Sequence, residues 1–412
     1  MELVSVSEAQ TLMMKCLGRL SVVSLRLAEA LGRALAEPVR ARDPVPPFDT
    51  SAMDGYALRA ADTQSAPVLL RVVGTVPAGS VWPSPLGPGE AVRIMTGAPL
   101  PEGADAVIEQ ERVAIEAEAL VRIDEPVESG RHVRRAGEDA QAGSVVLQPG
   151  TVLYPGAIAL AAAAGRGRLA VYRPARVAVI TTGDELLEPE EDLVPGKIRN
   201  TNRYLLEALI RNDGAEVVES LAAGDDVRAL LEAFVRVLPQ ADMVLTTGGV
   251  SVGAFDCVEK ALQKCDFQRV FWRVRQRPGK PLLFGLLAGK PFFGLPGNPV
   301  STGVCFDQYV RPALRYMMGM EPLYRPRLRA ILEEAFPAKK VGLHTFLRVR
   351  WYPRPDGRIG VRPTGPQGSH ITHSLARATA LAHLPESWGP VSAGTEVEVE
   401  LWSAAFDSPP ER

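Results

Sequence analysis

The spacing of apolar residues divides the chain into stretches of different periodicity. The first stretch has apolar residues at helical spacing, namely Ala9, Leu12, Met13, Cys16, Leu17 and Leu20. Ser5 and Glu8 match a capping box in front of them, so the pattern predicts an amphipathic helix. Further helices are predicted over residues 24–36, where Pro38 would end the helix, and over residues 156–164.

Short β-branched segments separated by turn residues occupy residues 68–147. Segments such as 69–73 are typical of strands, so this part of the chain is predicted to be an inserted all-β unit. The loop 43–57 is stiffened by prolines and ends in an Asp-Gly pair at Asp54. A turn between strands is the structural interpretation of this loop, and a site that uses Asp49 or Asp54 is the functional one.

From residue 176 onward, continuous apolar segments alternate with helical patterns. The predicted strands are 176–180, 217–218, 243–245 and 291–295. Candidate helix caps stand between or after them, namely Asn200, Asp225 or Asp226, and Asn298. This alternation predicts a doubly wound, mostly parallel sheet with helices on both faces. Alternating segments near 346–351 and 397–402 add a small C-terminal β unit.

Three turns rich in glycine and hydroxyl side chains follow predicted strands of this sheet. They span residues 181–185, 246–253 and 296–301. Because the carboxyl ends of parallel strands share one edge of a sheet, the three turns are expected to lie together. Their backbone N–H groups and Thr, Ser and Asn side chains suit phosphate oxygens or a polar ring. The sequence therefore predicts a site for a phosphate-bearing substrate at this edge.

Charged side chains near the same edge extend the hypothesis. The carboxylates expected there are Asp184, Glu185, Asp225, Asp226 and Asp256, and hard oxygen ligands of this kind suit magnesium. Helix capping is the alternative role of Asp225 and Asp226, and both roles stay open. Arg277 and Lys280 flank a Pro-Gly turn and could clamp phosphate or another tetrahedral oxyanion, with an exposed basic hairpin as the alternative.

Composition narrows the class of protein. With 412 residues, 46% of them hydrophobic, the chain is long enough for several cores. Its formal net charge of −2 gives no support to a general nucleic-acid binder. The four cysteines form no CxxC pair, which favours a reduced, cytoplasmic compartment. No segment resembles a signal peptide or is long and apolar enough to span a membrane, so no membrane association is expected.

Common catalytic motifs are missing. No Walker pattern is found, because Gly289-Lys290 is followed by proline, and no GxGxxG opens a helix. His370 and His373 form an HxxH without a third ligand nearby in the sequence, so the pattern does not predict a metal site there. Chemistry alone therefore stops at a phosphate- and magnesium-handling α/β enzyme with added β units.

Seven motifs resemble those of molybdopterin molybdenumtransferase, the bacterial counterpart of the gephyrin E domain. They are residues 47–57, 94–99, 137–139, 182–185, 247–253, 296–301 and 368–370. The motifs cover nearly the whole chain in family order. Two positions depart from many relatives, since Ala254 stands where an acidic or polar residue is common and Arg277 where a lysine is common.

The resemblance implies a multidomain α/β fold. Its central α/β domain, residues 174–324, would resemble molybdopterin adenylyltransferase. The other expected parts are an elongated helical linker domain with dimer contacts at 1–42 and 148–173, an inserted β domain at 43–147, a C-terminal β domain at 325–403 and a disordered tail at 404–412. The resemblance also implies a homodimer whose active-site cleft lies between subunits, with the motif around Asp54 supplied in trans.

The implied activity is insertion of molybdenum from molybdate into adenylylated molybdopterin, with magnesium present and release of AMP. The catalytic residues would be Asp54, Asp139, Glu185, Asp226, Asp256, Arg277 and Lys280. Magnesium ligands would be Glu185, Asp226 and Asp256. Substrate would be bound by Thr96, Thr182, Gly183, Gly248, Gly249, Ser251, Gly253, Pro296, Gly297, Asn298, Ser301, Arg348 and Ser369.

Alternative functions remain open at this point. The α/β module alone resembles molybdopterin adenylyltransferase, although that enzyme lacks the 43–147 and 325–403 units. A gephyrin-like scaffold that binds peptide tails is a second alternative. Tungstate could replace molybdate, because both are tetrahedral dianions of similar size. The adenylyltransferase and molybdoenzyme maturation factors would be possible protein partners.

Overall fold

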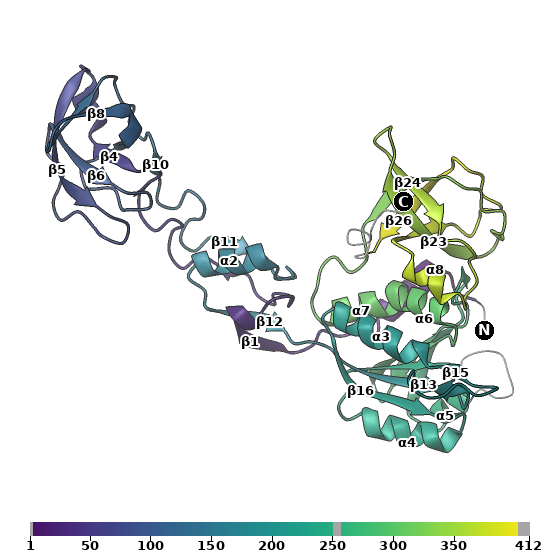
Figure 1. Ribbon diagram of the computed structural model, residues 1–412. Helices are drawn as coiled ribbons and strands as arrows, with labels where there is room; N and C mark the ends of the chain where they lie inside the picture. The colour runs from purple at the N-terminus through teal and green to yellow at the C-terminus, as the bar shows by residue number, and fades with distance from the viewer. Residues whose placement is uncertain (1–2, 250–256, 403–412) are drawn as a thin grey trace. The chain divides into compact units, whose positions relative to one another are not determined.

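The computed structural model describes residues 3–249 and 257–402, and these form two compact units. One unit comprises Ser24–Leu31 and Leu35–Val171. The other comprises residues up to Val23, Gly32–Ala34 and the chain from Tyr172 onward. Each unit has its own strands and core, in agreement with a multidomain fold (Figure 1). Within the described residues, no helix has the length and apolar character needed to cross a membrane.

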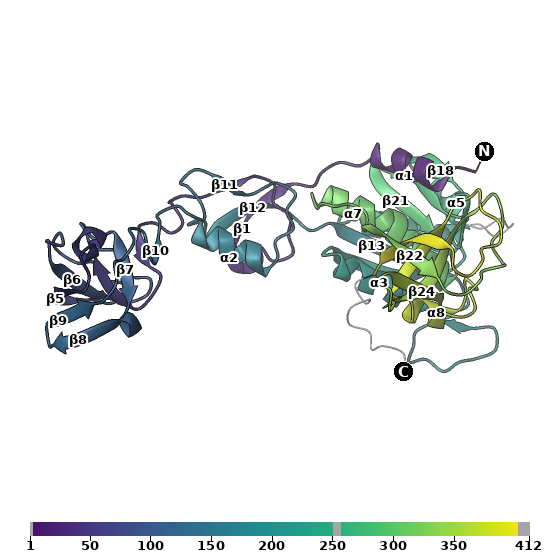
Figure 2. The same cartoon turned by 90° about the horizontal axis from the view of Figure 1, so that it is seen from above.

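The first of these units contains a six-stranded sheet in the order β7-β4-β6-β5-β9-β8 (Figure 2). Its strands are β4 (Gly55–Leu58), β5 (Val68–Val76), β6 (Glu90–Ile94), β7 (Ala106–Glu109), β8 (Val113–Ala117) and β9 (Leu120–Ile123). Buried residues such as Leu58, Val92 and Ile123 fill its two sides. The predicted all-β unit is confirmed.

Short elements complete this unit and fix its loops. Strand β3 (Thr50–Ser51) pairs with β10 (Val133–Arg134), and β2 (Val39–Arg40) pairs with β11 (Val145–Leu147). Helix α2 spans Pro155–Ala163, close to the predicted helix. Three single turns of 3₁₀ helix accompany them, namely η1 (Leu27–Glu29), η2 (Ala60–Thr63) and η3 (Gln110–Arg112).

The helix predicted over residues 24–36 is wrong. Residues Val22–Arg26 form strand β1, which pairs with β12 (Arg168–Tyr172) in a two-stranded sheet. Along β1 the side chains alternate between exposed and half-buried, as they do in a strand. The Arg168 guanidinium also donates a hydrogen bond of 2.8 Å to the carbonyl of Ser24. Pairing with a segment far along the chain overrides the local helical pattern.

The α/β part of the second unit has a six-stranded sheet in the order β16-β13-β17-β21-β20-β18. The strands are β13 (Arg176–Thr182), β16 (Glu216–Ala223), β17 (Met243–Thr247), β18 (Phe267–Trp272), β20 (Leu283–Leu287) and β21 (Lys290–Leu295). The first four in this order run parallel, while β20 is antiparallel to both of its neighbours. The mostly parallel sheet is thus confirmed.

Helices cover both faces of this sheet (Figure 1). Helices α4 (Val227–Val237) and α5 (Cys257–Leu262) share one apolar core with the strands, which includes Phe234, Val258 and Phe292. The opposite face is covered by α3 (Thr201–Asn212) and by a long apolar helix in three parts. Those parts are α6 (Pro299–Cys305), the π-helical turn η4 (Phe306–Val310) and α7 (Arg311–Met317).

The helices α1 (Val6–Met14), α3, α4 and α6 begin directly after the residues predicted to precede them. The Ser5–Glu8 capping box opens α1. The side chain of Asn200 accepts a hydrogen bond from the backbone N–H of Arg203, and that of Asp226 accepts one from Ala229. Asn298 also precedes a helix, with Pro299 at its first position, but its side chain makes no capping bond. The side-chain amide of Asn298 is therefore available for a hydrogen bond outside α6.

The C-terminal part is a barrel of five strands. They are β22 (Arg327–Leu332), β23 (His344–Pro353), β24 (Ile359–Pro363), β25 (Ala380–Leu384) and β26 (Glu396–Leu401). The strands pair in the order β23-β24-β22-β26-β25, and the ring closes because β25 also pairs with β23. The remaining elements are β14 (Leu186–Leu187), β15 (Ile198–Arg199), β19 (Gln276–Arg277) and α8 (Thr372–Ala376).

Candidate functional site

The three predicted turns meet at the carboxyl edge of the parallel sheet. The hydroxyl of Thr182 donates a hydrogen bond of 3.0 Å to the carbonyl of Thr247. The amide of Asn202 donates one of 2.7 Å to the carbonyl of Gly297. Gly248 adopts φ of +87°, and a Cβ there would lie only 2.6 Å from the Thr182 hydroxyl oxygen. The turns pack so closely that this position needs glycine.

A cavity of about 350 Å³ opens at this edge. The predicted residues that line it are Thr182, Glu185, Gly248, Gly297 and Asn298. Sequence reasoning missed further lining residues at the start of α3, of which Asn202 is the most buried. Asn200, predicted only as a helix cap, also lines the cavity. The N-terminal ends of α3 and α6 both open onto this space, which therefore suits an anionic group.

Other predicted residues lie around rather than in this cavity. Gly183 and Pro296 belong to the turns but do not line it. Ser301 is buried in α6, so its side chain cannot reach a ligand without rearrangement. The predicted residues Ser251, Gly253 and Asp256 lie outside the described residues.

The carboxylates near the carboxyl edge of the sheet make different contacts. Glu185 lines the cavity, and no other described residue donates a hydrogen bond to its carboxylate. Asp184 instead accepts a bond of 3.1 Å from the backbone N–H of Asp225. Asp226 caps α4 and does not line the cavity. No group of three His, Cys, Asp or Glu residues suited to a metal occurs among the residues described.

Arg348 is a buried cation on β23. Its side chain is among the largest fully buried ones, with 1% exposure. Its guanidinium donates to the Ser374 hydroxyl at 2.9 Å and to the Gly368 carbonyl at 3.4 Å, and both acceptors are neutral. Burial and the positive charge of Arg277 lower the pKa of Arg348 to about 10. Within residues 3–249 and 257–402, no carboxylate lies at ion-pair distance from Arg348. An anion is the natural complement of such a charge.

Arg277 and Lys280 stand on the neighbouring turn with exposed side chains. Strand β19 places Arg277 opposite Thr345 of β23, three residues before Arg348. A hollow of about 410 Å³ is lined by Arg277 and by loop residues that include Gln367 and Gly368. The turn and the loop thus border one space, whose lining includes the cation Arg277 and the carboxylate Glu334. The buried guanidinium of Arg348 bonds to the carbonyl of Gly368, which also lines this space.

Ser369 lies between this hollow and the sheet-edge cavity. Its neighbour Gly368 lines the hollow, whereas His370 lines the cavity. The Ser369 hydroxyl accepts a hydrogen bond of 2.9 Å from the Asn298 amide, and its carbonyl accepts one from the backbone N–H of Val300. One short loop therefore forms part of the wall of both spaces.

The predicted residues of the other unit lie on loops that bond to one another. One carboxylate oxygen of Asp54 accepts bonds from the backbone N–H and the hydroxyl of Thr96, at 2.7 and 2.8 Å. These bonds lower the pKa of Asp54. The backbone N–H of Asp139 donates to the carbonyl of Val45, while Asp49 pairs with Arg135 at 2.6 Å. The motif loops around residues 45–54, 96 and 135–139 are thereby joined within this unit.

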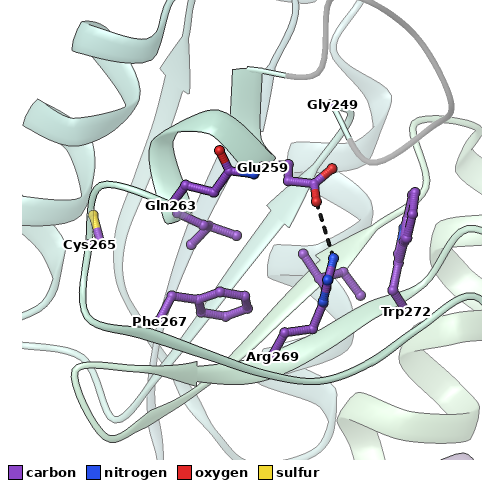
Figure 3. Close-up of a pocket in the computed structure, with 9 residues that line it drawn as sticks. Gly249, Glu259, Gln263, Cys265, Phe267, Arg269 and Trp272 are labelled. Atoms are coloured by element: carbon purple, nitrogen blue, oxygen red, sulfur yellow. Dashed lines mark hydrogen bonds and ion pairs between the residues drawn. The ribbon is translucent and has the colours of Figure 1, made fainter. Parts of the chain in front are cut away.

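A second cavity, of about 210 Å³, lies between α5 and β18 (Figure 3). Phe267 and Trp272 form its aromatic wall, and the Glu259 carboxylate meets the Arg269 guanidinium across it at 3.1 Å. Gly249 is the one predicted site residue among those described that line it. The sequence offered no signal for this space, because its walls come from an ordinary amphipathic helix and an edge strand.

Comparisons with known proteins cover nearly all of the chain. Residues 4–165 match the family described as MoeA N-terminal region (domain I and II). Residues 178–316 match a probable molybdopterin binding domain, and residues 329–402 match the MoeA C-terminal region (domain IV). All three matches follow one another in the order that the motifs predict.

Relatives that match nearly the whole chain support the same family. Molybdopterin molybdenumtransferase 2 of Mycobacterium tuberculosis is 39% identical over 405 residues, which are 96% of this chain and 98% of the relative. The Haemophilus influenzae molybdopterin molybdenumtransferase is 39% identical over 380 residues, 91% of this chain and 93% of its own. The crystal structure of the molybdopterin biosynthesis moeA protein from Pyrococcus horikoshii matches with a TM-score of 0.83 and 32% identity, covering 97% of this chain and 100% of that chain. The chain therefore belongs to the molybdopterin molybdenumtransferase family.

Proposed function

We propose that this chain inserts molybdenum from molybdate into adenylylated molybdopterin and releases AMP in a magnesium-dependent reaction. Its family makes it a transferase of molybdenum cofactor biosynthesis. The observation that carries the proposal is the pair of adjoining spaces on either side of Ser369. One suits a phosphate-bearing ligand and the other a small oxyanion, so both reactants would meet at one loop.

The sheet-edge cavity would hold the phosphate and pterin end of the substrate. The start of α3 lines this cavity, and its first backbone N–H groups would bind such a ligand. Thr182 and Asn298 add polar side chains at the wall. Preformed donors of this kind stabilise charge that develops on a phosphate as its anhydride bond breaks.

The hollow beside Arg277 would receive molybdate. A tetrahedral dianion matches the cations Arg277, Lys280 and Arg348 in charge, and a planar guanidinium can hold two of its oxygens at once. Arg348 is already desolvated before binding, so its attraction to an anion is stronger than that of an exposed cation. Tungstate has the same charge and shape and would bind by the same contacts.

Magnesium fits the described residues in part. Glu185 offers a carboxylate that no described residue occupies, whereas the carboxylate of Asp226 is engaged as a helix cap. We propose Glu185 and Asp256 as the main ligands, with Asp226 as the weakest candidate. The bound ion would neutralise phosphate oxygens of the substrate.

Asp54, Thr96 and Asp139 would complete the site from a second copy of the chain in a homodimer. All three side chains are exposed, and Asp54 is held by bonds from Thr96 within its own unit. These residues offer acceptors rather than cations. The proposal therefore draws the polar groups of one site from two copies of the chain. A cytoplasmic location is proposed from the sparse, unclustered cysteines.

The test supplies purified protein with adenylylated molybdopterin, magnesium and molybdate, and measures AMP release. Wild type should release AMP only when molybdate is present, and Arg277→Met should slow release at limiting molybdate. Arg329→Met, which removes an exposed arginine of β22, is the matched control and should behave as wild type. Conversion of molybdopterin and ATP into the adenylylated form would instead assign the preceding, adenylylating step. Stoichiometric peptide binding without AMP release would assign a scaffold.

A further inference from the structure

The turn that carries Arg277 and Lys280 exposes its side chains but buries its backbone. Pro278 and Gly279 are both buried between the two exposed cations. Gly279 adopts φ of +86°, and a Cβ there would lie 2.4 Å from the sulfur of Cys305. The position of both cations therefore depends on what surrounds Gly279 in the interior.

The side chain of Gln276 lies at the centre of the groups that surround Gly279. Its side chain is 1% exposed, and its amide N–H group donates to the carbonyl of Gly279 at 3.1 Å and toward the sulfur of Cys305 at 3.4 Å. Its amide oxygen accepts a hydrogen bond from the hydroxyl of Tyr309. We call Gln276, Cys305 and Tyr309 the Gln276 triad. The triad uses both ends of one amide to join a helix to the turn.

The chemistry of the triad keeps these bonds in place. Burial raises the pKa of both Tyr309 and Cys305, so each stays protonated. Tyr309 thereby remains a donor to the Gln276 amide oxygen, and the Cys305 thiol, which accepts from the Gln276 amide, donates to the carbonyl of Gly279 at 3.6 Å. A buried amide that lost either partner would carry an unsatisfied polar atom, which is unfavourable. The arrangement of the turn seen here satisfies every member of the triad.

The segment that carries Tyr309 is itself anchored. Tyr309 lies in the π-helical turn Phe306–Val310, where the Gln308 amide donates to the Glu400 carboxylate at 2.7 Å. Asp307 in the same turn pairs with Arg325 at 2.8 Å. The far end of the triad is thus held by the C-terminal barrel, the same barrel that presents Arg348.

We infer that the Gln276 triad is a positioning device that fixes the 277–280 turn relative to Arg348 and thereby sets the affinity for the oxyanion. The inference rests on the proposed role of Arg277 and Lys280 in binding molybdate. Tyr309 and Gln276 would not touch the anion. They would act by keeping two exposed cations at the spacing that a tetrahedral anion requires, which lowers the ordering cost of binding.

The test compares full-length wild type with Tyr309→Phe and Gln276→Met. Molybdate binding is measured by calorimetry, and AMP release gives KM for molybdate and kcat separately. Loss of one or two positioning bonds should raise Kd and KM for molybdate about fivefold to tenfold while kcat changes less than about twofold. The temperature midpoint of unfolding is recorded for every variant.

Two controls make the result specific. Tyr324→Phe removes the hydroxyl of a nearby half-buried tyrosine outside the triad and should leave Kd unchanged. Cys305→Ser keeps a small donor beside Gly279 and should bind molybdate nearly as wild type, whereas Cys305→Ala should bind it more weakly. The cysteine pair also keeps the inference testable if Gln276→Met does not fold.

The outcomes separate the inference from the proposed function. A lower unfolding midpoint with unchanged Kd and KM in Tyr309→Phe and Cys305→Ala would overturn the positioning role and leave a purely structural one. If Arg277→Met binds molybdate as tightly as wild type, molybdate does not bind at Arg277. That result would overturn both the proposed molybdate site and the positioning role of the triad. Weaker binding in Arg277→Met with no change in the triad variants overturns the inference alone.

Discussion

The side-chain amide of Asn298 donates a hydrogen bond of 2.9 Å to the hydroxyl of Ser369, 71 positions later in the chain. Asn298 precedes α6 at the edge of the parallel sheet, and Ser369 belongs to the loop before α8. An asparagine in front of a helix usually caps that helix, but here it ties the α/β sheet to the C-terminal barrel. The bond lies where the two candidate spaces adjoin.

This bond predicts coupled effects on activity. Asn298→Ala and Ser369→Ala should each lower kcat/KM for AMP release about fivefold, because the loop between the two spaces loses its tether. The double variant should be little worse than either single one, with a coupling of about 1 kcal/mol. Effects that multiply independently in the cycle would show that the bond does not hold the loop during the reaction.

Arg348→Met should have opposite effects on stability and binding. The buried guanidinium has only neutral partners among the described residues, so replacing it by an apolar side chain of similar length should leave the free energy of unfolding unchanged or raise it by about 1 kcal/mol. Molybdate binding should be lost. Denaturant unfolding and calorimetry measure the two quantities, and a destabilised variant that still binds molybdate would contradict the assignment.

The Thr96 contacts predict a shift in a pH profile. The backbone N–H and hydroxyl of Thr96 lower the pKa of Asp54 by bonding to its charged form. Thr96→Val removes the hydroxyl bond, so the pKa of Asp54 should rise and the acid limb of the rate profile should move to higher pH. A carboxylate titration by NMR checks the pKa directly, with Thr75→Val of strand β5 as the control variant.

Substitutions at Glu185 and Asp226, two of the three candidate metal carboxylates, should separate their roles. Glu185→Gln should raise the magnesium concentration needed for half-maximal AMP release, because its carboxylate faces the cavity. Asp226→Asn keeps the ability to cap α4 and should leave the magnesium requirement unchanged, while Asp226→Ala should cost about 1 kcal/mol of stability. An altered magnesium requirement in Asp226→Asn would return Asp226 to the metal site.

The half-buried imidazole of His344, which lies 3.2 Å from that of the buried His383, predicts how stability depends on pH. Burial, and then the neighbouring charges of His383, Arg327 and Lys339, lower the pKa of His344 from 6.5 to about 3. Between these values the unfolded chain binds a proton that the folded chain does not, so stability should fall as pH drops below 6.5. The slope from this group is about 1.4 kcal/mol per pH unit.

Denaturant unfolding of wild type and His344→Gln between pH 7 and pH 4 checks this slope. The variant should lose stability less steeply, since its side chain does not titrate. Equal slopes in the two proteins would mean that other groups account for the acid sensitivity of the fold.

Local patterns in the sequence predicted much of the fold. The strands that became β13, β17 and β21 are short apolar runs, and Asn200 and Asp226 cap the helices they precede. Strand period and helix capping depend on residues within a few positions, so they can be read without knowing the fold. The same reasoning failed for residues 24–36, because pairing of β1 with β12 is a contact between distant segments.

The motifs likewise located the candidate site without its geometry. They named the three turns, Asp54 with Thr96, and the cations Arg277 and Arg348. Nothing in the sequence distinguishes the exposure of those two arginines, and Gln276, Ser374 and Tyr309 belong to no motif that was recognised. The proposed roles of these three residues depend on their burial and on hydrogen bonds to residues far along the chain. Both arise only when the chain is packed.

The sequence by itself determined which residues could supply strands, helix caps, phosphate-binding turns and cations, because those properties are local or belong to single side chains. The tertiary structure decided that Asp226 is used as a cap, that Glu185 faces the cavity, and that Asn298 bonds to Ser369 instead of capping α6. Each of these choices depends on which distant group competes for the same hydrogen bond, and that competition is settled only when the chain is packed.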